Sequence, residues 1–558
     1  MQKNSSIQQE IIPIRSINEQ QANTINQNQE NNENENIETN ENIKPELTNK
    51  IKVVKLENET DIQNYCKLLK NGQEQSDSVL LKLNQSINKL NLSKIYSQQC
   101  DQQILSQLKE LNELNLSYNN LKTLPEQLNQ MKRLQTLDIS YNNLDNIDNL
   151  SSLTNLQNLN ISFSFNINQQ NFIRELASLV NLQQLNVSRN NITNIESLAS
   201  LVNLQQLNVS CNKISGIESL ASFVNLQQLD VSWNKISGIE SLANLVNLQQ
   251  LDVSRNEIFS IESLASLVNL QQLDVSGNKI SGIESLTSLI NLQQLNVSYN
   301  KISSIESLAS LVALQQLNVV KNKITNIESL ASLVNLQQLN VNWNEISNIE
   351  SLASLVDIQQ ISLDNNLFGN EYLFSYRTFA KISYQQINYL SLCGSKLNNI
   401  DFLKYFKNLQ TLKLNNNFIF DIGVLEHCQK LQSLYLNDNI ILEVNSLQRI
   451  ELQDLKIQNN YIQDFSPIKN HQNFKKYEKR YQRIPELRDY QKYNKSKAVK
   501  NSFYKKYSEE NRSKKFSNKL QTVKYELQRK ILKNLMNMNT ALAVLQTFLQ
   551  LENERGNQ

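Results

Sequence analysis

The sequence from Leu182 to Asn190 is LQQLNVSRN, and this string decides the fold because it returns along the chain. Each copy begins 22 residues after the previous one. A fixed period of this size is the signature of a repeat architecture, in which every unit buries its apolar face against the next. The chain is therefore predicted to form a solenoid. Near-copies begin at Leu204, Leu226, Leu248, Leu270, Leu292, Leu314 and Leu336, with a looser one at Ile358.

Weaker copies extend the array on both sides and fit the pattern L-x-x-L-x-L-x-x-N-x-L. They give about sixteen units over residues 111–465, and Ile87, Leu90 and Leu92 form a candidate seventeenth. The interval before Leu182 has 26 residues and the one after Ile358 has 29, and the second is expected to form an outer loop or extra turn. The weaker copies begin at Leu111, Leu134, Leu156, Ile387, Leu409, Leu431 and Leu452.

The letters of one unit predict its structure. Leu185 and Val187 alternate with polar residues, so they point to one side of a short strand, and stacked strands form a parallel sheet. Asn190 follows where the chain turns, and its amide can satisfy stranded backbone N–H and C=O groups. About eleven residues remain for the outer face, which is room for a short helix or 3₁₀ turn. The rest of the core is assigned to Ile192, Ile195, Leu198, Leu201 and Leu204.

The pattern I-x-x-I-E-x-L followed by L-x-N-L-x-x-L-x-L-x-x-N resembles the 22-residue class of leucine-rich repeats, over about 355 of the 558 residues. That class includes the nuclear regulatory subunit of type-1 protein phosphatase and bacterial internalins. The resemblance implies an α/β repeat solenoid, a horseshoe with a parallel concave sheet and short helices or 3₁₀ turns outside. It also implies ligand binding without catalysis, and it identifies no partner, because this repeat serves many.

Composition separates the array from the N-terminal part of the chain. Nineteen of the 25 residues from Glu19 to Ile43 are Asn, Gln or Glu. Such a stretch buries too little apolar surface to offset chain entropy. Residues 1–50 are therefore predicted to be disordered, and 51–110 to form a flank with a candidate degenerate repeat.

The C-terminal tail is basic, whereas the body is acidic. Residues 466–558 carry 22 Lys or Arg against 8 Asp or Glu, and residues 1–465 carry 33 against 45. We interpret 466–512 as a basic linker and 513–555 as an amphipathic or coiled-coil helix, because its apolar residues follow heptad spacing. The tail is a candidate contact for an acidic partner or for self-association.

Few residues are suited to catalysis or metal binding. His427 and His471 are the two histidines, the 9 glycines are scattered, and the 5 cysteines lie far apart. No catalytic, cofactor or metal site and no small-molecule substrate is expected. The column from Glu196 to Glu350 is interpreted as the first-turn acid of each outer helix. No apolar run is long enough for a transmembrane segment and no secretory signal is visible, so a cytoplasmic or nuclear location is predicted.

One column varies between otherwise near-identical turns, directly before the repeated Asn. Beside it, the strand position that faces outward is Asp in three consecutive turns and Asn in most others, whereas the column from Gln184 to Gln338 is uniform and is expected to be exposed. Aromatic and Arg residues are common interface anchors. Drift at a permissive surface position is the alternative. The predicted partner-binding residues are Arg189, Asp230, Trp233, Asp252, Arg255, Asp274, Tyr299, Lys321 and Trp343.

These features predict a non-enzymatic protein–protein interaction scaffold that binds its partner on the concave face or its rim. One alternative is a regulatory subunit of a Ser/Thr protein phosphatase. Another is a surface adhesin of internalin type.

Overall fold

The computed structural model describes residues 52–56, 58–70, 79–83, 86–96, 104–164, 169–367, 385–462 and 464–469. These residues fall into two compact units, one up to Leu367 and one from residue 385 onward. The predicted disordered segment, most of the basic linker and the predicted tail helix lie outside the described residues.

The first unit is built on short parallel strands that pair in strict register. Leu251 of β10, for example, lies opposite Leu229 of β9 and Leu273 of β11. The predicted parallel sheet is therefore confirmed. Its strands are β3 (Lys89–Asn91), β4 (Glu113–Asn115), β5 (Thr136–Asp138), β6 (Asn158–Asn160), β7 (Gln184–Asn186), β8 (Gln206–Asn208), β9 (Gln228–Asp230), β10 (Gln250–Asp252), β11 (Gln272–Asp274), β12 (Gln294–Asn296), β13 (Gln316–Asn318), β14 (Gln338–Asn340) and β15 (Gln360–Ser362).

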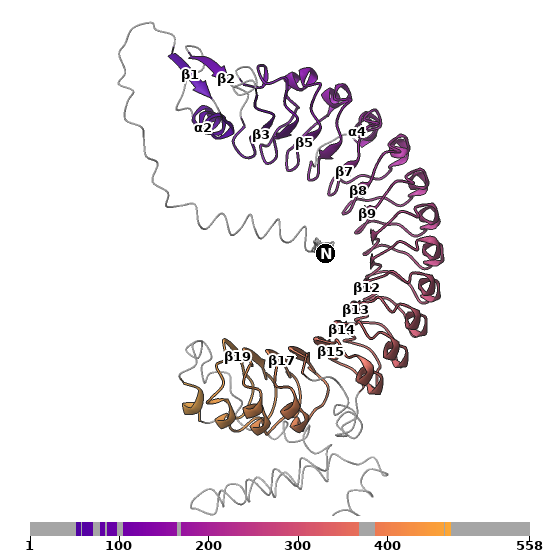
Figure 1. Cartoon of the computed structure of the whole chain (residues 1–558), viewed down its shortest axis with the longest axis vertical. Coiled ribbons are helices and arrows are strands. Elements are labelled where there is room, and N and C mark those ends of the chain that lie inside the picture. Colours follow the sequence, from indigo (N-terminus) through magenta and orange to yellow (C-terminus); the bar gives the residue numbers. More distant parts are fainter. Residues whose placement is uncertain are drawn as a thin grey trace, which may run out of the picture. The chain divides into compact units, whose positions relative to one another are not determined.

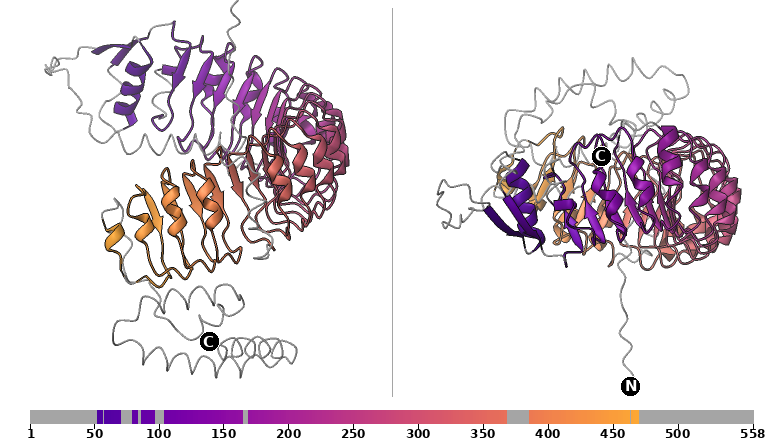
Figure 2. Two further views of the ribbon diagram at one scale, coloured as in Figure 1. Left: turned by 60° about the horizontal axis from the view of Figure 1, so that its bottom comes forward. Right: turned by 90° about the horizontal axis from the view of Figure 1, so that it is seen from above.

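Short 3₁₀ helices form the outer layer of this unit, with the strands on the inner side (Figures 1 and 2). Each repeat from Glu196 onward begins its 3₁₀ helix at the repeated Glu, as predicted. The Leu, Ile and Val positions of the repeat are buried between the two layers. The 3₁₀ helices are Glu126–Gln130, Asp148–Ser152, Glu196–Ser200, Glu218–Ser222, Glu240–Asn244, Glu262–Ser266, Glu284–Ser288, Glu306–Ser310, Glu328–Ser332 and Glu350–Ser354.

The repeated Asn forms the predicted ladder through the turns after the strands. The side-chain nitrogen of Asn212 donates to the backbone oxygens of Val187 and Val209, at 3.1 and 2.9 Å. Its side-chain oxygen accepts from the backbone N–H groups of Asn190 and Ile192, at 3.0 and 2.9 Å. With a further bond to the backbone oxygen of Ser210 at 3.2 Å, one buried amide thus contacts five backbone groups and links neighbouring turns.

The N-terminal flank closes the edge of the sheet. β1 (Lys52–Leu56) and β2 (Val79–Leu83) pair in parallel, and α2 (Glu59–Lys70) follows β1 along the chain. From α2, Glu59 accepts a hydrogen bond from the Asn91 N–H at 2.8 Å, and Gln63 donates to the Asn91 oxygen at 3.0 Å. The helix therefore satisfies backbone groups that an edge strand leaves open.

The extra residues before Leu182 form a helix, α4 (Gln169–Leu176), where neighbouring turns have a 3₁₀ helix. Phe172, Ile173 and Leu176 of α4 are buried, so the outer layer is continuous here. The longer interval after Ile358 falls mainly on residues 368–384, outside the described part of the chain.

The second unit repeats the same design. Its strands pair in parallel and in register, and each strand is followed in sequence by a 3₁₀ helix. The strands are β16 (Tyr389–Ser391), β17 (Thr411–Lys413), β18 (Ser433–Tyr435) and β19 (Asp454–Lys456), and the 3₁₀ helices are Asp401–Tyr405, Gly423–His427, Asn445–Leu447 and Ser466–Ile468.

Candidate functional site

The variable residues of the first unit share one backbone conformation. We call this set the rim column. Each member lies directly before the ladder Asn or its equivalent in the turn, and each has a positive φ between 53° and 67°. The rim column comprises Lys94, Tyr118, Tyr141, Phe163, Arg189, Cys211, Trp233, Arg255, Gly277, Tyr299, Lys321, Trp343 and Asn365.

The repeat fixes this backbone conformation at every rim position. The backbone conformation does not determine which residue types occupy the column. The left-handed region favours Gly and Asn and costs other residues about 1–2 kcal/mol. The backbone of this turn is nevertheless the same at Gly277, Asn365 and Trp233. The fold therefore explains the conformation of the column but not its aromatic and basic side chains.

Three aromatic members near the start of the array are stacked. The ring centroids of Tyr118 and Tyr141 lie 4.1 Å apart, and those of Tyr141 and Phe163 lie 4.3 Å apart. Lys94 lies 5.5 Å from the Tyr118 centroid, and Arg189 lies 4.7 Å from that of Phe163. Lys94, Tyr118, Tyr141 and Phe163 were not among the residues predicted from the sequence. Tyr118 and Tyr141 directly precede the template Asn, whereas Ile95 and Ser164 replace that Asn after Lys94 and Phe163.

Arg255 is held between two rings further along the column. Its guanidinium carbon lies 5.0 Å from the Trp233 ring centroid and 5.7 Å from that of Tyr299. It reaches Tyr299 across Gly277, where an added Cβ would lie only 2.8 Å from the Arg255 Cδ. Such cation–π contacts contribute about 0.5–1 kcal/mol each at exposed sites and fix the side chain.

The column continues with Lys321 and Trp343. Lys321 Nζ lies 5.0 Å from the Tyr299 centroid. Trp343 is 59% exposed, and within the described residues no ring or cation contact involves its indole. A large exposed ring of this kind is the type of side chain that anchors interfaces.

The three predicted carboxylates lie side by side on the strands next to this part of the column. Asp252 pairs in register with Asp230 on one side and Asp274 on the other. Asp252 is buried, with 6% exposed, and the other two are half-buried. Among the described residues, no ion pair joins Arg255 to any of the three.

Burial raises the pKa of two of these carboxyl groups, those of Asp252 and Asp230. Desolvation, followed by the charges of Asp274 and Asp230, raises the pKa of Asp252 to about 8, and hydrogen bonds from Ser254 only partly offset this. Desolvation also raises the pKa of Asp230, against hydrogen bonds from Ser232 and Ser210. Asp252 therefore holds its proton near neutral pH, and a cationic partner would favour its charged form.

The uniform Gln column is less exposed than the sequence analysis expected. Gln184 is exposed, but Gln250 is half-buried and Gln272 is only 3% exposed. The reason is that these side chains stand on the inner face, where adjacent strands are close enough for long side chains to cover one another.

The described residues contain no candidate metal site and no candidate membrane-spanning helix. No group of three or more His, Cys, Asp or Glu side chains there is placed to hold a metal ion. In the same part of the chain, the helices are too short or too polar to cross a membrane.

The stacked parallel strands, 3₁₀ outer layer and Asn ladder define a repeat solenoid with an exposed variable column. Two family models identify the family: one described as a leucine-rich repeat region matches residues 73–262, and one described as leucine-rich repeats (2 copies) matches 268–310 and 290–332. The chain is a leucine-rich repeat protein.

Several solved structures are similar to this chain. A leucine-rich repeat protein of Leptospira interrogans is 25% identical, with 66% of this chain and 90% of that chain covered and a TM-score of 0.52. An internalin of Listeria monocytogenes is 28% identical, covering 59% and 88%, at a TM-score of 0.49. The plant peptide hormone receptor RGFR1, solved in complex with RGF2, shares the fold at 20% identity, with coverages of 67% and 69% and a TM-score of 0.50. The comparison with curated proteins finds no match.

Proposed function

We propose that the chain is a non-enzymatic protein-interaction scaffold whose partner binds at the turns from β9 to β12. Solenoids of this kind use their extended surfaces for recognition. The observation that carries the proposal is a coincidence of two columns. Asp replaces Asn on β9, β10 and β11, and Arg255 lies between the rings of Trp233 and Tyr299 in the turns that follow β9, β10 and β12. We call Trp233, Arg255 and Tyr299 the clamp.

The chemistry of the site favours a partner with a basic group beside an apolar one. Asp230, Asp252 and Asp274 would accept a cationic side chain, which relieves their mutual repulsion. The exposed edges of Trp233 and Tyr299 would contact the apolar part. Since the other turns are nearly identical, these residues also give the partner a defined register along the array.

Affinity capture with the full chain tests this proposal. Gly is the suitable replacement because it adopts the left-handed conformation without strain. Replacing Trp233 and Tyr299 by Gly should leave folding intact and should lower the affinity for the captured partner protein about 30-fold or more. The control Asn365→Gly changes the same column outside the clamp and should change little.

Equal capture by the double variant and the unaltered chain would overturn the proposal. Capture of a Ser/Thr phosphatase, lost in the double variant, would assign the site to the regulatory-subunit alternative.

A further inference from the structure

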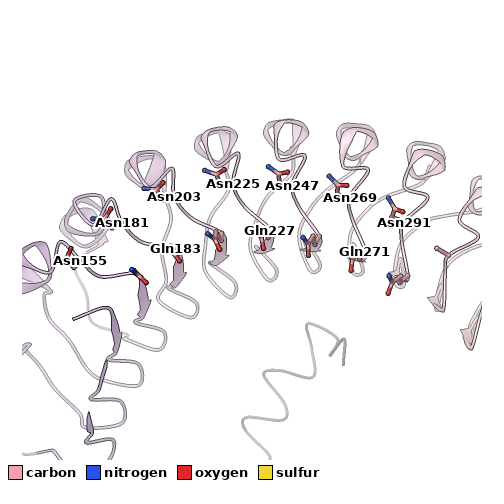
Figure 3. Close-up of a pocket in the computed structure, with 15 residues that line it drawn as sticks. Asn155, Asn181, Gln183, Asn203, Asn225, Gln227, Asn247, Asn269, Gln271 and Asn291 are labelled. Carbon is pink, nitrogen blue, oxygen red and sulfur yellow. The ribbon is translucent and has the colours of Figure 1, made fainter. Parts of the chain in front are cut away.

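A second surface lies along the edge of the first unit where the strands begin. It is a groove of about 1140 Å³, lined by one Asn and one Gln from each turn between Asn155 and Gln293. Figure 3 shows the Asn side chains beside the outer turns and the Gln side chains near the strand starts. We call it the edge groove. The rim column and the Asp cluster contribute no residue to its lining.

The Asn side chains of the edge groove are held in one orientation. The side-chain nitrogens of Asn203, Asn225 and Asn247 donate to backbone oxygens of the preceding turns at 2.9, 3.1 and 2.9 Å. Each bond fixes the amide plane and leaves the side-chain oxygen without a hydrogen bond within the described residues. The groove thus presents a periodic row of fixed acceptors.

The Gln side chains add donors to this row. No hydrogen bond involves the side chains of Gln183, Gln205 or Gln227 within the described residues, and their amides can donate and accept. None of the lining residues is ionisable. A ligand of this groove is therefore neutral and rich in groups that both donate and accept, such as hydroxyls.

An apolar ridge borders the Asn row. Val180, Val202 and Val224 each directly precede a lining Asn, and each is close to half exposed. Exposed apolar side chains beside a polar groove mark an interaction surface. Hydroxyl edges and C–H faces occur together in the rings of a sugar chain.

Spacing distinguishes a sugar chain from a polypeptide. The turns repeat at the strand separation of about 4.8 Å, whereas side chains on one face of an extended peptide repeat at about 6.7 Å. The residues of a β-linked hexose chain repeat at nearly the interval of the turns. We propose that the edge groove binds a neutral β-linked polysaccharide, one sugar for each turn.

The sequence limits the length of this site. Ala313 replaces Asn in the turn after Asn291 and is the last lining residue. Beyond it the same columns continue with Asn335, Gln337 and Gln359, which do not line the groove. These positions provide matched controls.

Calorimetric titration of the full chain with neutral β-linked glucan, mannan and chitin oligosaccharides tests the proposal. Affinity should rise with oligosaccharide length and should not fall with added salt, because the groove carries no charge. Gln205→Ala with Gln227→Ala should weaken binding about tenfold, since two hydrogen-bonding amides are lost. Gln337→Ala with Gln359→Ala should leave it unchanged, and Ala313→Asn should tighten binding of the longest chains.

Two results would overturn the proposal: no binding of any of these glycans by the folded chain, or binding that the Gln205/Gln227 variant retains in full. A groove-dependent complex with an Asn/Gln peptide instead would assign the surface to polypeptide. Trp233→Gly should leave glycan binding intact, which separates this site from the proposed protein-binding clamp.

Discussion

Arg255 keeps its position between Trp233 and Tyr299 because Gly277, the next member of the rim column, has no side chain. A Cβ at Gly277 would lie 2.8 Å from the Arg255 Cδ. A residue with a Cβ would also be strained by the φ of +67° at this position. The clamp therefore depends on one residue that contributes no atoms to it.

Gly277→Ala should displace Arg255 from Tyr299 and lower the free energy of unfolding by about 1–2 kcal/mol, from left-handed strain and the lost ring contact. Chemical denaturation measures the loss. Asn365→Ala is the control, since it has a similar φ of 54° outside the clamp. Equal losses in the two variants would mean that the Arg255 contact contributes nothing to stability.

Asp252 makes stability depend on pH. Its pKa is about 8 in the folded chain, against an ordinary value of 3.8, so the folded state binds more protons between these values. Stability should therefore fall as pH rises from about 4 to about 8. Asp252→Asn keeps the acceptor that Ser254 N–H uses at 2.8 Å. It should raise the free energy of unfolding at pH 8 by on the order of 2 kcal/mol.

Thermal unfolding across this pH range checks the Asp252 prediction. The matched control is Asp138→Asn, because Asp138 has Asn115 and Asn160 as its strand partners and no carboxylate beside it in register. A pH profile of Asp252→Asn that coincides with that of the unaltered chain would contradict the assignment of the proton to this cluster.

The sequence predicts where residues lie in the repeat, but it does not predict which side chains contact one another. The repeat places Trp233, Arg255 and Tyr299 in one column, and it places the three Asp on adjacent strands. The stacking of Tyr118 on Tyr141 and the reach of Arg255 across Gly277 depend on side-chain conformation in a left-handed turn. Periodicity carries no information on such conformations.

Among the elements, the Asn ladder links each turn to the next. Asn212→Ala removes hydrogen bonds to five backbone groups of two turns. An unsatisfied buried polar group costs about 1–3 kcal/mol, so the loss should be about 3 kcal/mol or more. Urea unfolding measures it.

Asn203→Ala is the control for the ladder variant, because Asn203 is exposed and donates one hydrogen bond, to the Val180 oxygen at 2.9 Å. It should cost about 1 kcal/mol or less. A similar cost for Asn212→Ala would show that water or relaxed neighbours replace the ladder bonds.

Regular elements followed from the sequence, whereas inserted ones did not. The repeat predicts each strand and 3₁₀ helix because buried Leu and Ile positions fix the register. The extra residues before Leu182 carry no copy of the template, so their folding as α4 (Gln169–Leu176) could not be predicted from the period. The capping of β3 by α2 also has no periodic signal, because Glu59 and Gln63 act through single hydrogen bonds.

For the whole molecule, the pairing of each turn with its neighbours predicts how far the unfolding caused by a core substitution extends. The Val231 N–H donates to the backbone carbonyl oxygen of Asp252, and the Val253 N–H to that of Asp274, each at 2.9 Å, so hydrogen bonds run from turn to adjacent turn. Leu251 is fully buried, and Leu251→Asp places an unpaired carboxylate in the core at a cost of several kcal/mol. Because each turn of a solenoid contacts only its neighbours, the substitution should destabilise the adjoining turns most.

Hydrogen–deuterium exchange of the Leu251→Asp variant should therefore increase most in β9–β11 and decline with each turn away from them. Residues 385–462 of the second unit should keep their protection. Gln250→Asp is the matched control, because it introduces the same side chain one residue earlier, on the half-buried inner face. Uniform loss of protection across both units would contradict the nearest-neighbour argument, since it would require the two units to unfold as one cooperative body. An unchanged exchange pattern would instead mean that Leu251 does not face the core.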